Sequence, residues 1–266
     1  MRAVFTSRAG GVSTAPFDSF NLGNHVGDSP EHVSANRAAL QSALGSRPVF
    51  LTQMHGNDVQ VLGPVTADRQ LADACLTTER GVACTVMVAD CLPVLLTTGD
   101  GSVVAAAHAG WRGLAGAGDL AGKGVLEALL DAFYERFRPP AQVELAGAAI
   151  KIIAWLGPCI GPTAFEVGTE VKAAFKLSRL DAARFFMPVA AAESGKYLAD
   201  LAGLARLRLQ ALGVTAIYGN DGSPAWCTVS NPSRFFSHRR DAAVGAGGAG
   251  NGFGTTGRMA ACIWRV

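Results

Sequence analysis

Short apolar runs recur along the chain and predict β-strands. Each is a few residues long, rich in Val, Ile, Leu and Ala, and bounded by turn residues. Several runs are apolar throughout rather than alternating with polar positions, so we expect those strands to be covered on both faces. The predicted strands are Ala3–Thr6, Val49–Gln53, Val59–Leu62, Val82–Val88, Val94–Thr97, Val103–Ala107, Ile150–Leu156, Ala216–Tyr218 and Met259–Trp264.

Four longer segments carry apolar residues at helical spacing. Pro30–Leu44 has the clearest ends, because Ser29 can cap its N-terminus and Gly45 suits a C-terminal stop. The other predicted helices are approximately Ala115–Phe137, Gly168–Leu177 and Tyr197–Leu212. Helices and strands mix without strict alternation, which favours a layered α+β sandwich over a doubly wound parallel sheet.

One glycine-rich stretch of low complexity stands out from a sequence that otherwise shows no repeat or linker. No internal repeat and no Pro/Ser-rich linker divides the chain, which predicts a single domain over residues 1–266. The low-complexity stretch is Ala242–Thr256, AAVGAGGAGNGFGTT. Its small side chains bury too little surface to fix the backbone, so we expect a mobile surface loop there.

Composition and charge exclude several classes of protein. Apolar residues make up 49% of the chain and charged residues 17%, which excludes disorder for most of its length. A net charge of +2 predicts neither a nucleic-acid partner nor binding to an acidic membrane face. No apolar run is long enough for a membrane span or a signal peptide. The six cysteines lack Cys-x-x-Cys spacing, so we expect reduced thiols and a cytoplasmic location.

Three of the predicted strands lead to a potential metal ligand and then to a turn. His55, Cys91 and His108 each follow one of these strands, and a Gly or Pro lies within two residues of each. A strand end holds a side chain rigidly, and glycine lets backbone or substrate approach closely. Two His and one Cys suit zinc, and three protein ligands leave a fourth position open for water or substrate. Spacing alone is weak evidence for a metal site, and the alternative is that Cys91 is a buried thiol and that His55 and His108 are core histidines.

Two other chemistries use the same residue types. A blue-copper centre also takes two His and one Cys but needs a weak axial ligand, and we expect Met54 to point away from His55 along an extended strand. A multicopper oxidase needs more His than the five in this chain. Cys91 can also act as a nucleophile activated by a neighbouring His. The other five cysteines have apolar surroundings and are expected to be packing thiols.

Three segments combine Arg with glycine or aromatic residues and are candidates for binding phosphate or a carboxylate. Arg8 lies beside a Gly-Gly turn, Arg112 lies where a helix begins, and Arg239 follows shortly after Phe236 and Ser237. A guanidinium bonds two oxygens at once, and a phenyl ring can stack on a base. An ordinary ion-paired surface Arg is the alternative for each of the three.

Asn21 and Asp73 complete the candidate substrate-binding set. Both are flanked by turn or apolar residues, and capping a turn is the alternative role for each. Glu166 is either a helix-start carboxylate or an acid/base group. We interpret His25 and His32 as a loop histidine and a helix-surface histidine.

Eight ordered motifs resemble the laccase-domain (YfiH-like) family. They are TSRAGGVS, FNLGNHVGD, QMHG, VADCLPVLL, HAGWRG, LGPCIGPTAFEVG, FFSHRRD and TGRMAACIW, and the likeness extends from Val4 to Trp264. The resemblance implies an α-β-β-α sandwich in which helices flank two packed sheets. It also implies a zinc site formed by His55, Cys91 and His108, which we take as the catalytic and metal-binding residues. The chain departs from the family in its glycine-rich stretch, where members have only a few residues.

The resemblance implies several activities. The first is zinc-dependent phosphorolysis of inosine, adenosine and methylthioadenosine, with adenosine deamination at the same site. The second is a hydrolase that edits peptidoglycan precursors through Cys91, and an older description is a copper polyphenol oxidase. Phosphorolysis fits best, because Arg8, Arg112 or Arg239 can bind phosphate. We therefore expect Zn²⁺ as cofactor, with Cu²⁺ as the alternative, and a purine nucleoside and phosphate as small-molecule partners.

Overall fold

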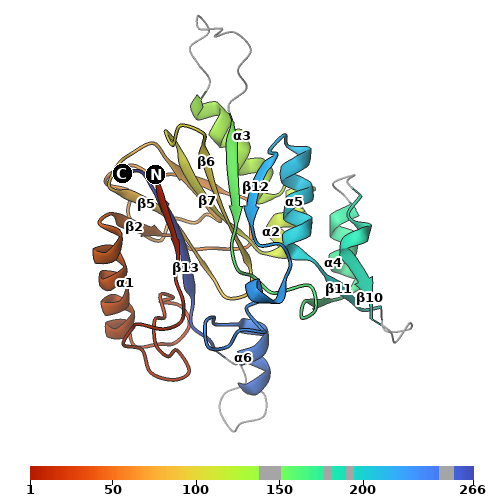
Figure 1. Cartoon of the computed structure of the whole chain (residues 1–266), viewed down its shortest axis with the longest axis horizontal. Helices are drawn as coiled ribbons and strands as arrows, with labels where there is room; N and C mark the ends of the chain where they lie inside the picture. The colour runs from red at the N-terminus through yellow and green to blue at the C-terminus, as the bar shows by residue number, and fades with distance from the viewer. Residues whose placement is uncertain (138–150, 177–180, 190–194, 246–254) are drawn as a thin grey trace, which may run out of the picture.

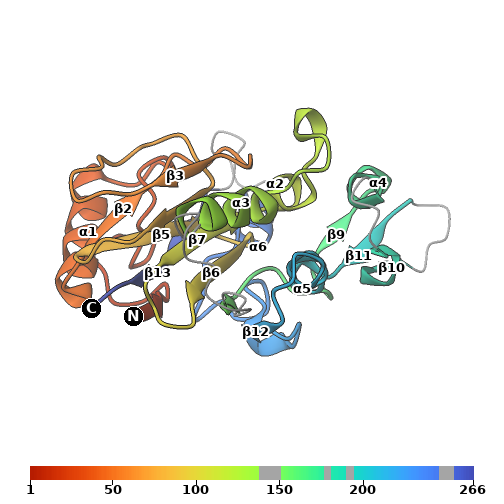
Figure 2. The same cartoon turned by 90° about the horizontal axis from the view of Figure 1, so that it is seen from above.

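Two β-sheets pack face to face at the centre of the fold, and helices cover their outer faces (Figures 1 and 2). The computed structural model describes residues 1–137, 151–176, 181–189, 195–245 and 255–266. Helix α1 (Pro30–Leu44) packs on a four-stranded sheet, which packs in turn on a six-stranded sheet, and helix α3 (Val125–Phe137) packs on the far side. The layers therefore run α-β-β-α, and the predicted α+β fold is confirmed.

The four-stranded sheet joins the beginning and the end of the described chain. Its order is β1 (Arg2–Phe5), β13 (Met259–Trp264), β5 (Val82–Val88) and β2 (Arg47–Phe50). β13 is antiparallel to both β1 and β5, whereas β2 runs parallel to β5. β5 and β13 are the antiparallel central pair. The residues that follow β5 and those that precede β13 therefore lie at the same end of the sheet.

The six-stranded sheet is mixed and carries two of the predicted ligand positions. Its central strands β6 and β7 are antiparallel to each other, and β4 is antiparallel to β7. Both edges are closed by parallel pairs, β12 with β8 and β3 with β4. In order, its strands are β12 (Ala216–Gly219), β8 (Ile152–Leu156), β6 (Leu92–Thr98), β7 (Val104–Ala109), β4 (Ala74–Thr77) and β3 (Val59–Val61).

Successive residues of the central strands enter two different cores. On β5, Ala83 and Met87 pack toward α1, whereas Cys84 and Val86 pack toward the six-stranded sheet. Every residue of β5, β6 and β7 is buried. This confirms the expectation that continuously apolar strands are covered on both faces.

Helix α1 has the ends that its sequence predicts. The Ser29 hydroxyl accepts a hydrogen bond from the backbone N–H of His32, and Pro30 occupies the first turn. Gly45 ends the helix in the left-handed region with φ of 62°. Val33, Leu40 and Leu44 are buried on the face that packs against the sheet.

Two predicted helices begin too early. Of the segment predicted as Ala115–Phe137, only Val125–Phe137 forms α3. The first residue of that segment ends a short helix α2 (Trp111–Ala115), and a 3₁₀ turn η1 (Gly118–Leu120) follows, because Gly116 and Gly122 adopt positive φ and stop the helical path. The segment predicted as Tyr197–Leu212 starts as strand β11 (Tyr197–Ala199). Asp200 then caps α5 (Leu201–Ala211) by accepting from the N–H of Gly203.

A small third sheet lies beside α5 and was not predicted. Its order is β10 (Phe186–Pro188), β11 and β9 (Glu166–Val167), and β4 is the other strand that the sequence prediction lacks. The remaining helical segments are α4 (Thr169–Lys176), η2 (Ala183–Phe185), η3 (Pro224–Trp226) and α6 (His238–Gly245). Ile150 and Leu177, which end two predicted elements, lie outside the described residues.

The glycine-rich stretch Ala242–Thr256 is described only at its two ends. Helix α6 extends into it as far as Gly245, and Thr256 is buried, with its hydroxyl donating to the carboxylate of Asp241. Residues 246–254 lie outside the described residues. Within the part of the chain that the structure describes, no helix has both the length and the apolar character that spanning a bilayer requires.

Candidate metal centre and cavity

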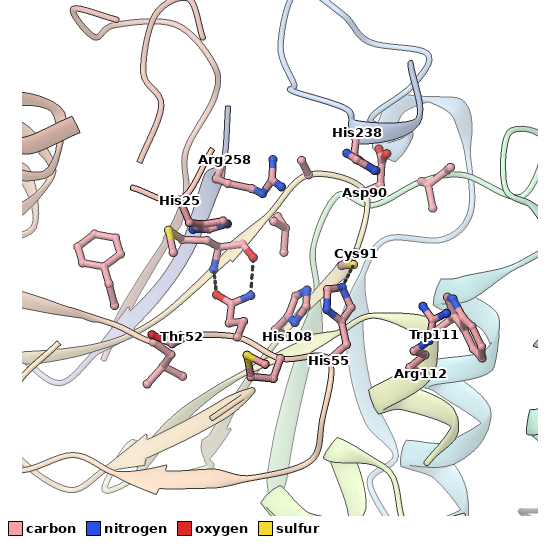
Figure 3. Close-up of a pocket in the computed structure, with 18 of the residues that line it drawn as sticks. His25, Thr52, His55, Asp90, Cys91, His108, Trp111, Arg112, His238 and Arg258 are labelled. Atoms are coloured by element: carbon pink, nitrogen blue, oxygen red, sulfur yellow. Dashed lines mark hydrogen bonds between the residues drawn. The ribbon is translucent and has the colours of Figure 1, made fainter. Parts of the chain in front are cut away.

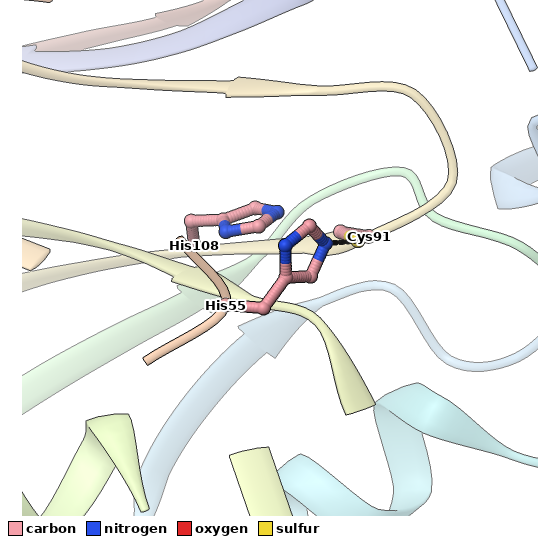
Figure 4. Close-up of side chains that lie close together, drawn as sticks. All are labelled: His55, Cys91 and His108. Atoms are coloured by element: carbon pink, nitrogen blue, oxygen red, sulfur yellow. Dashed lines mark hydrogen bonds between the residues drawn. The ribbon is translucent and has the colours of Figure 1, made fainter. Parts of the chain in front are cut away.

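His55, Cys91 and His108 converge at one point where the two sheets meet (Figure 4). His55 follows β2, Cys91 lies in the turn between β5 and β6, and His108 is near the end of β7. Their ligand atoms all lie within 4.8 Å of one another, and Cys91 Sγ is 3.6 Å from His55 Nε2. Among the described residues, this is the single group of three or more His, Cys, Asp or Glu side chains close enough to share a metal ion.

The carboxylate of Asp73 positions both His55 and His108 through hydrogen bonds. It accepts hydrogen bonds from the backbone N–H groups of Met54, His55 and Gly56, at 2.7 to 3.0 Å. The same carboxylate lies 2.7 Å from His108 Nδ1. This contact leaves Nε2 of His108 as the nitrogen available to a ligand. The carboxylate also compensates the unusual backbone of His55, which has φ of 60°.

Gln53 fastens the His55 segment to the strand that leads to Cys91. Its side-chain amide donates to the carbonyl of Met87 at 2.8 Å and accepts from the N–H of Met87 at 2.7 Å. β2 ends at Phe50, so this side chain continues the hydrogen bonding along β5 where the backbone no longer does. Both polar ends of Gln53 are thereby occupied in positioning the site.

A glycine keeps the centre of the site open. A Cβ at Gly110 would lie 2.5 Å from His55 Cδ2 and 3.1 Å from Cys91 Sγ. Any side chain at this position would displace one of the ligands, so glycine is required here.

The three ligand side chains perturb one another's protonation. Burial opposes the Cys91 thiolate, but His108 and His55 lower the pKa of that thiol to about 6. Burial also opposes the charged His108 ring, yet Cys91 and Asp73 raise the pKa of His108 to about 9. Two imidazoles and a readily formed thiolate are a donor set that zinc prefers.

The three ligands lie in the floor of a cavity of about 880 Å³ (Figure 3). Trp111 and Arg112 lie on one side of the ligands, and His25 and Arg258 lie on the other. The volume is in the range of small-molecule sites. Further lining residues are Asn24, Arg37, Phe50, Leu51, Thr52, Gln53, Met54, Arg69, Met87, Val88, Ala89, Asp90, Ile160, Phe165, Leu201, His238 and Arg239.

Two of the predicted substrate-binding residues line this cavity. Arg112 stacks on the ring of Trp111, with 4.4 Å from its guanidinium carbon to the ring centroid. Arg239 donates from its guanidinium to the carbonyls of Ala164 and Glu166. Asp73 is 1% exposed and contacts the metal ligands instead of the cavity.

The structure places the other predicted substrate-binding residues outside the cavity. Arg8 pairs with Asp18 and lies over the ring of Phe236. Phe236 and Ser237 are fully buried, so neither presents a surface to a substrate in this conformation. Asn21 is also fully buried, and its side chain bonds within the turn that it begins and to the backbone N–H of Arg258.

Several cavity residues escaped prediction, and the extended backbone expected at Met54 and His55 is absent. Met54 lines the same cavity as His55, because the left-handed backbone of His55 breaks the alternation of an extended strand. His25, interpreted as a loop histidine, also lines the cavity. Arg258 was missed as well. The signal that could have identified both residues is their position in family motifs, since His25 lies in FNLGNHVGD and Arg258 lies in TGRMAACIW.

Comparison with known proteins identifies the family. The model of the family described as multi-copper polyphenol oxidoreductase laccase matches residues 2–266. The chain belongs to this laccase-domain, YfiH-like family. It is 44% identical over 264 residues to a Pseudomonas aeruginosa protein named purine nucleoside phosphorylase, covering 99% of this chain and 93% of that one. It is also 44% identical over 266 residues to the purine nucleoside phosphorylase YfiH of Escherichia coli strain K12, with the same coverage.

Solved structures of YfiH-like proteins share the fold. A crystal structure of a Neisseria meningitidis protein matches with a TM-score of 0.78 and 42% identity, over 98% of this chain and 93% of that one. The structure of YfiH from Bacillus licheniformis matches with a TM-score of 0.81 and 28% identity, over 99% and 92%. The predicted family is thus confirmed.

Proposed function

We propose that the protein is a zinc-dependent purine nucleoside phosphorylase that also deaminates adenosine. The observation that carries the proposal is the His55, Cys91 and His108 centre in the floor of a cavity with cationic side chains on both sides. Relatives at 43–44% identity named purine nucleoside phosphorylase support this choice of reaction. Inosine, adenosine and methylthioadenosine are the proposed nucleosides.

Zinc fits the donor set better than copper does. His55, Cys91 and His108 would hold the ion, and the three donors leave one coordination position for a substrate or water. When bound, zinc supplies a Lewis acid at the cavity floor. A multicopper centre would need additional His clusters, and the whole chain contains only five His.

Phosphorolysis exchanges the base of the nucleoside for phosphate. A phosphate oxygen bonds to the anomeric carbon of the ribose while the bond from that carbon to the purine nitrogen breaks. The purine leaves with the bonding electron pair and takes up a proton, and ribose 1-phosphate is the second product. Cationic side chains on one side of the cavity would bind the phosphate, and the ring of Trp111 on the other side offers a planar surface for the purine.

The direct test is release of hypoxanthine from inosine by the purified, zinc-loaded protein. We expect release only when phosphate is present, with one ribose 1-phosphate formed for each hypoxanthine. Release that is independent of phosphate would indicate a hydrolase. No release by protein that contains one zinc per chain would contradict the proposal.

The deaminase activity is tested separately. Adenosine and water give inosine and ammonia, so this reaction needs no phosphate. We expect ammonia from adenosine in phosphate-free buffer, and loss of that ammonia in a Cys91→Ala variant. Ammonia release that persists without Cys91 would locate the activity elsewhere or in a contaminant.

A second candidate function is a cysteine hydrolase acting on an amide of a peptidoglycan precursor. The observation that favours it is the 3.6 Å contact between Cys91 Sγ and His55 Nε2, together with the lowered pKa of the Cys91 thiol. In this reaction the thiolate attacks the amide carbonyl, the amine leaves with a proton, and water cleaves the resulting thioester. Intact-mass measurement of an acyl adduct on Cys91 would favour this candidate over phosphorolysis.

A further inference from the structure

We propose that Arg258, with His25 beside it, forms the phosphate subsite of the cavity. This inference rests on the proposed phosphorolysis and names the residues that recognise its second substrate. Arg258 immediately precedes β13, and Met259 pairs with Val88 at the end of β5. The antiparallel register therefore holds Arg258 beside the turn that carries Cys91, and Figure 3 shows it between His25 and Asp90 at the edge of the metal centre.

Contacts to its backbone and to the aliphatic stem of its side chain hold Arg258 in place. Its N–H donates to Asn21 Oδ1 at 2.8 Å, and Asn21 is itself fully buried. A Cβ at Gly23 would lie 2.8 Å from Arg258 Cγ, so this glycine makes room for the stem. Nη1 donates to the carbonyls of Thr256 and Gly257 at 2.9 and 3.2 Å. The guanidinium is thus oriented before any ligand binds.

The charge of Arg258 has no carboxylate partner. Within the described ranges, no Asp or Glu oxygen lies within 4.0 Å of its guanidinium, whereas Arg37 pairs with Asp68 and Arg240 with Asp241. Nε and Nη2 of Arg258 likewise have no hydrogen-bond acceptor among the residues that the structure describes. The free edge of this positively charged guanidinium suits a tetrahedral oxyanion, which can accept two hydrogen bonds at once.

Burial lowers the pKa of the Arg258 guanidinium, and the negative charges of Cys91 and Asp90 offset part of this from beyond ion-pair distance. Asp90 uses its carboxylate to accept from the Thr228 hydroxyl and from the backbone N–H of Arg239 at the start of α6. Burial, together with the positive charges of Arg258 and Arg37, lowers the pKa of His25. His25 therefore remains a neutral hydrogen-bonding group beside the cation at neutral pH.

The opposite side of the metal centre has a different character. Arg112 lies on the short helix α2 and is exposed, and it stacks on the ring of Trp111. An exposed cation stacked on a partly buried ring is less confined than Arg258. We assign the Trp111 side to the nucleoside, which makes Arg112→Gln the matched control for removal of one cavity cation.

The experiment is a titration of the zinc-loaded protein with inorganic phosphate, followed by ³¹P NMR line broadening. We expect Arg258→Gln to weaken phosphate binding at least about tenfold, since a hydrogen bond to a charged group is lost together with the charge. Gly23→Ala, which keeps every charge but crowds the Arg258 stem, should weaken binding by a smaller factor. Arg112→Gln should stay within about twofold of the wild type in phosphate affinity and instead raise the KM for inosine.

Circular dichroism and zinc content identify any variant that fails to fold. If Arg258→Gln fails to fold, Gly23→Ala alone tests the subsite. Phosphate affinity that is unchanged in both Arg258→Gln and Gly23→Ala overturns the subsite, as does loss of binding in Arg112→Gln alone. Arg258-dependent phosphate binding without any cleavage of inosine would retain the subsite and overturn the proposed function. Cleavage of inosine with the same KM for phosphate in the wild type and in Arg258→Gln would retain the proposed function and overturn the subsite.

Discussion

The thiols of this protein occupy two contrasting environments. Cys91 lies in a turn at the cavity floor, next to two imidazoles, and its pKa is lowered to about 6. Cys262 lies in the middle of β13, in the core between the sheet and α1, and burial raises its pKa to about 12 even though the Thr85 hydroxyl donates to its sulfur. Burial also raises the pKa of Cys84, which lies on the adjacent strand β5.

The difference teaches that position on the strand decides the chemistry of a thiol here. The mid-strand thiols Cys84 and Cys262 are enclosed by apolar side chains, so burial outweighs even the hydrogen bond that Thr85 donates to Cys262. A residue one turn beyond the strand can meet side chains from other strands, as Cys91 meets His55 and His108. Four predictions test this contrast, in order of expected effect.

The largest effect is expected from removing the sulfur at the cavity. Cys91→Ala should lose bound zinc and reduce kcat/KM for phosphorolysis by about 10³-fold or more, as loss of a central catalytic group does. Cys262→Ala serves as the control and should retain one zinc per chain. Metal analysis and initial rates provide the measurement, and full zinc occupancy in Cys91→Ala would refute the assignment of Cys91 as a ligand.

Removing the carboxylate behind the histidines should have the next largest effect. Asp73→Asn keeps the shape but weakens the acceptor for His108 and for three backbone N–H groups. We expect zinc affinity to fall by about 10- to 100-fold, as for other partners of metal-bound histidines. Competition with a chromophoric chelator measures the affinity. Asp131→Asn, which removes an exposed partner of Lys123, should leave it unchanged.

Alkylation of the metal-free protein should separate the two thiol environments by pH. With a pKa of about 6, the thiolate fraction of Cys91 falls about tenfold between pH 7 and pH 5, because the thiolate and not the thiol reacts. The iodoacetamide rate at Cys91, followed by peptide mass mapping, should fall with it. Cys262 should stay unmodified throughout, and added zinc should protect Cys91. A rate at Cys91 that is flat until pH 8 would contradict the lowered pKa.

The smallest functional effect is expected in the core between the sheets. Cys84→Ser places a hydroxyl among fully buried apolar side chains, which should lower the free energy of unfolding by about 1–3 kcal/mol. Zinc content and the phosphate KM should not change. Denaturant unfolding measures the first quantity. A loss of zinc without loss of stability would show that the two regions are coupled.

The candidate metal centre was predictable because each part of it has a local signal. Apolar runs mark the strands, and a His or Cys followed by glycine or proline marks the end of each. The proposed phosphate subsite has no such signal at the end of a strand, since Asn21 and Arg258 are 237 positions apart and meet where the segment after β1 lies beside the start of β13, the strand with which β1 pairs. Aromatic neighbours were misleading in the same way: Phe236 resembles a stacking platform in sequence but is fully buried.

Element ends show the same limit on a smaller scale. The caps of α1 were predicted because Ser29 and Gly45 act on their own helix. The start of α3 was not, because helical periodicity continues through Gly116 and Gly122 although both glycines adopt positive φ. Apolar periodicity predicts which face is buried, while backbone conformation at glycine depends on the packing around it.

The central claim is an open zinc site with one sulfur and two imidazole donors. Zinc-edge X-ray absorption of protein purified without added metal tests it most directly. The account predicts one sulfur at about 2.3 Å and three nitrogen or oxygen scatterers at about 2.0–2.1 Å. Two or more sulfur scatterers, or copper in place of zinc at one ion per chain, would contradict it.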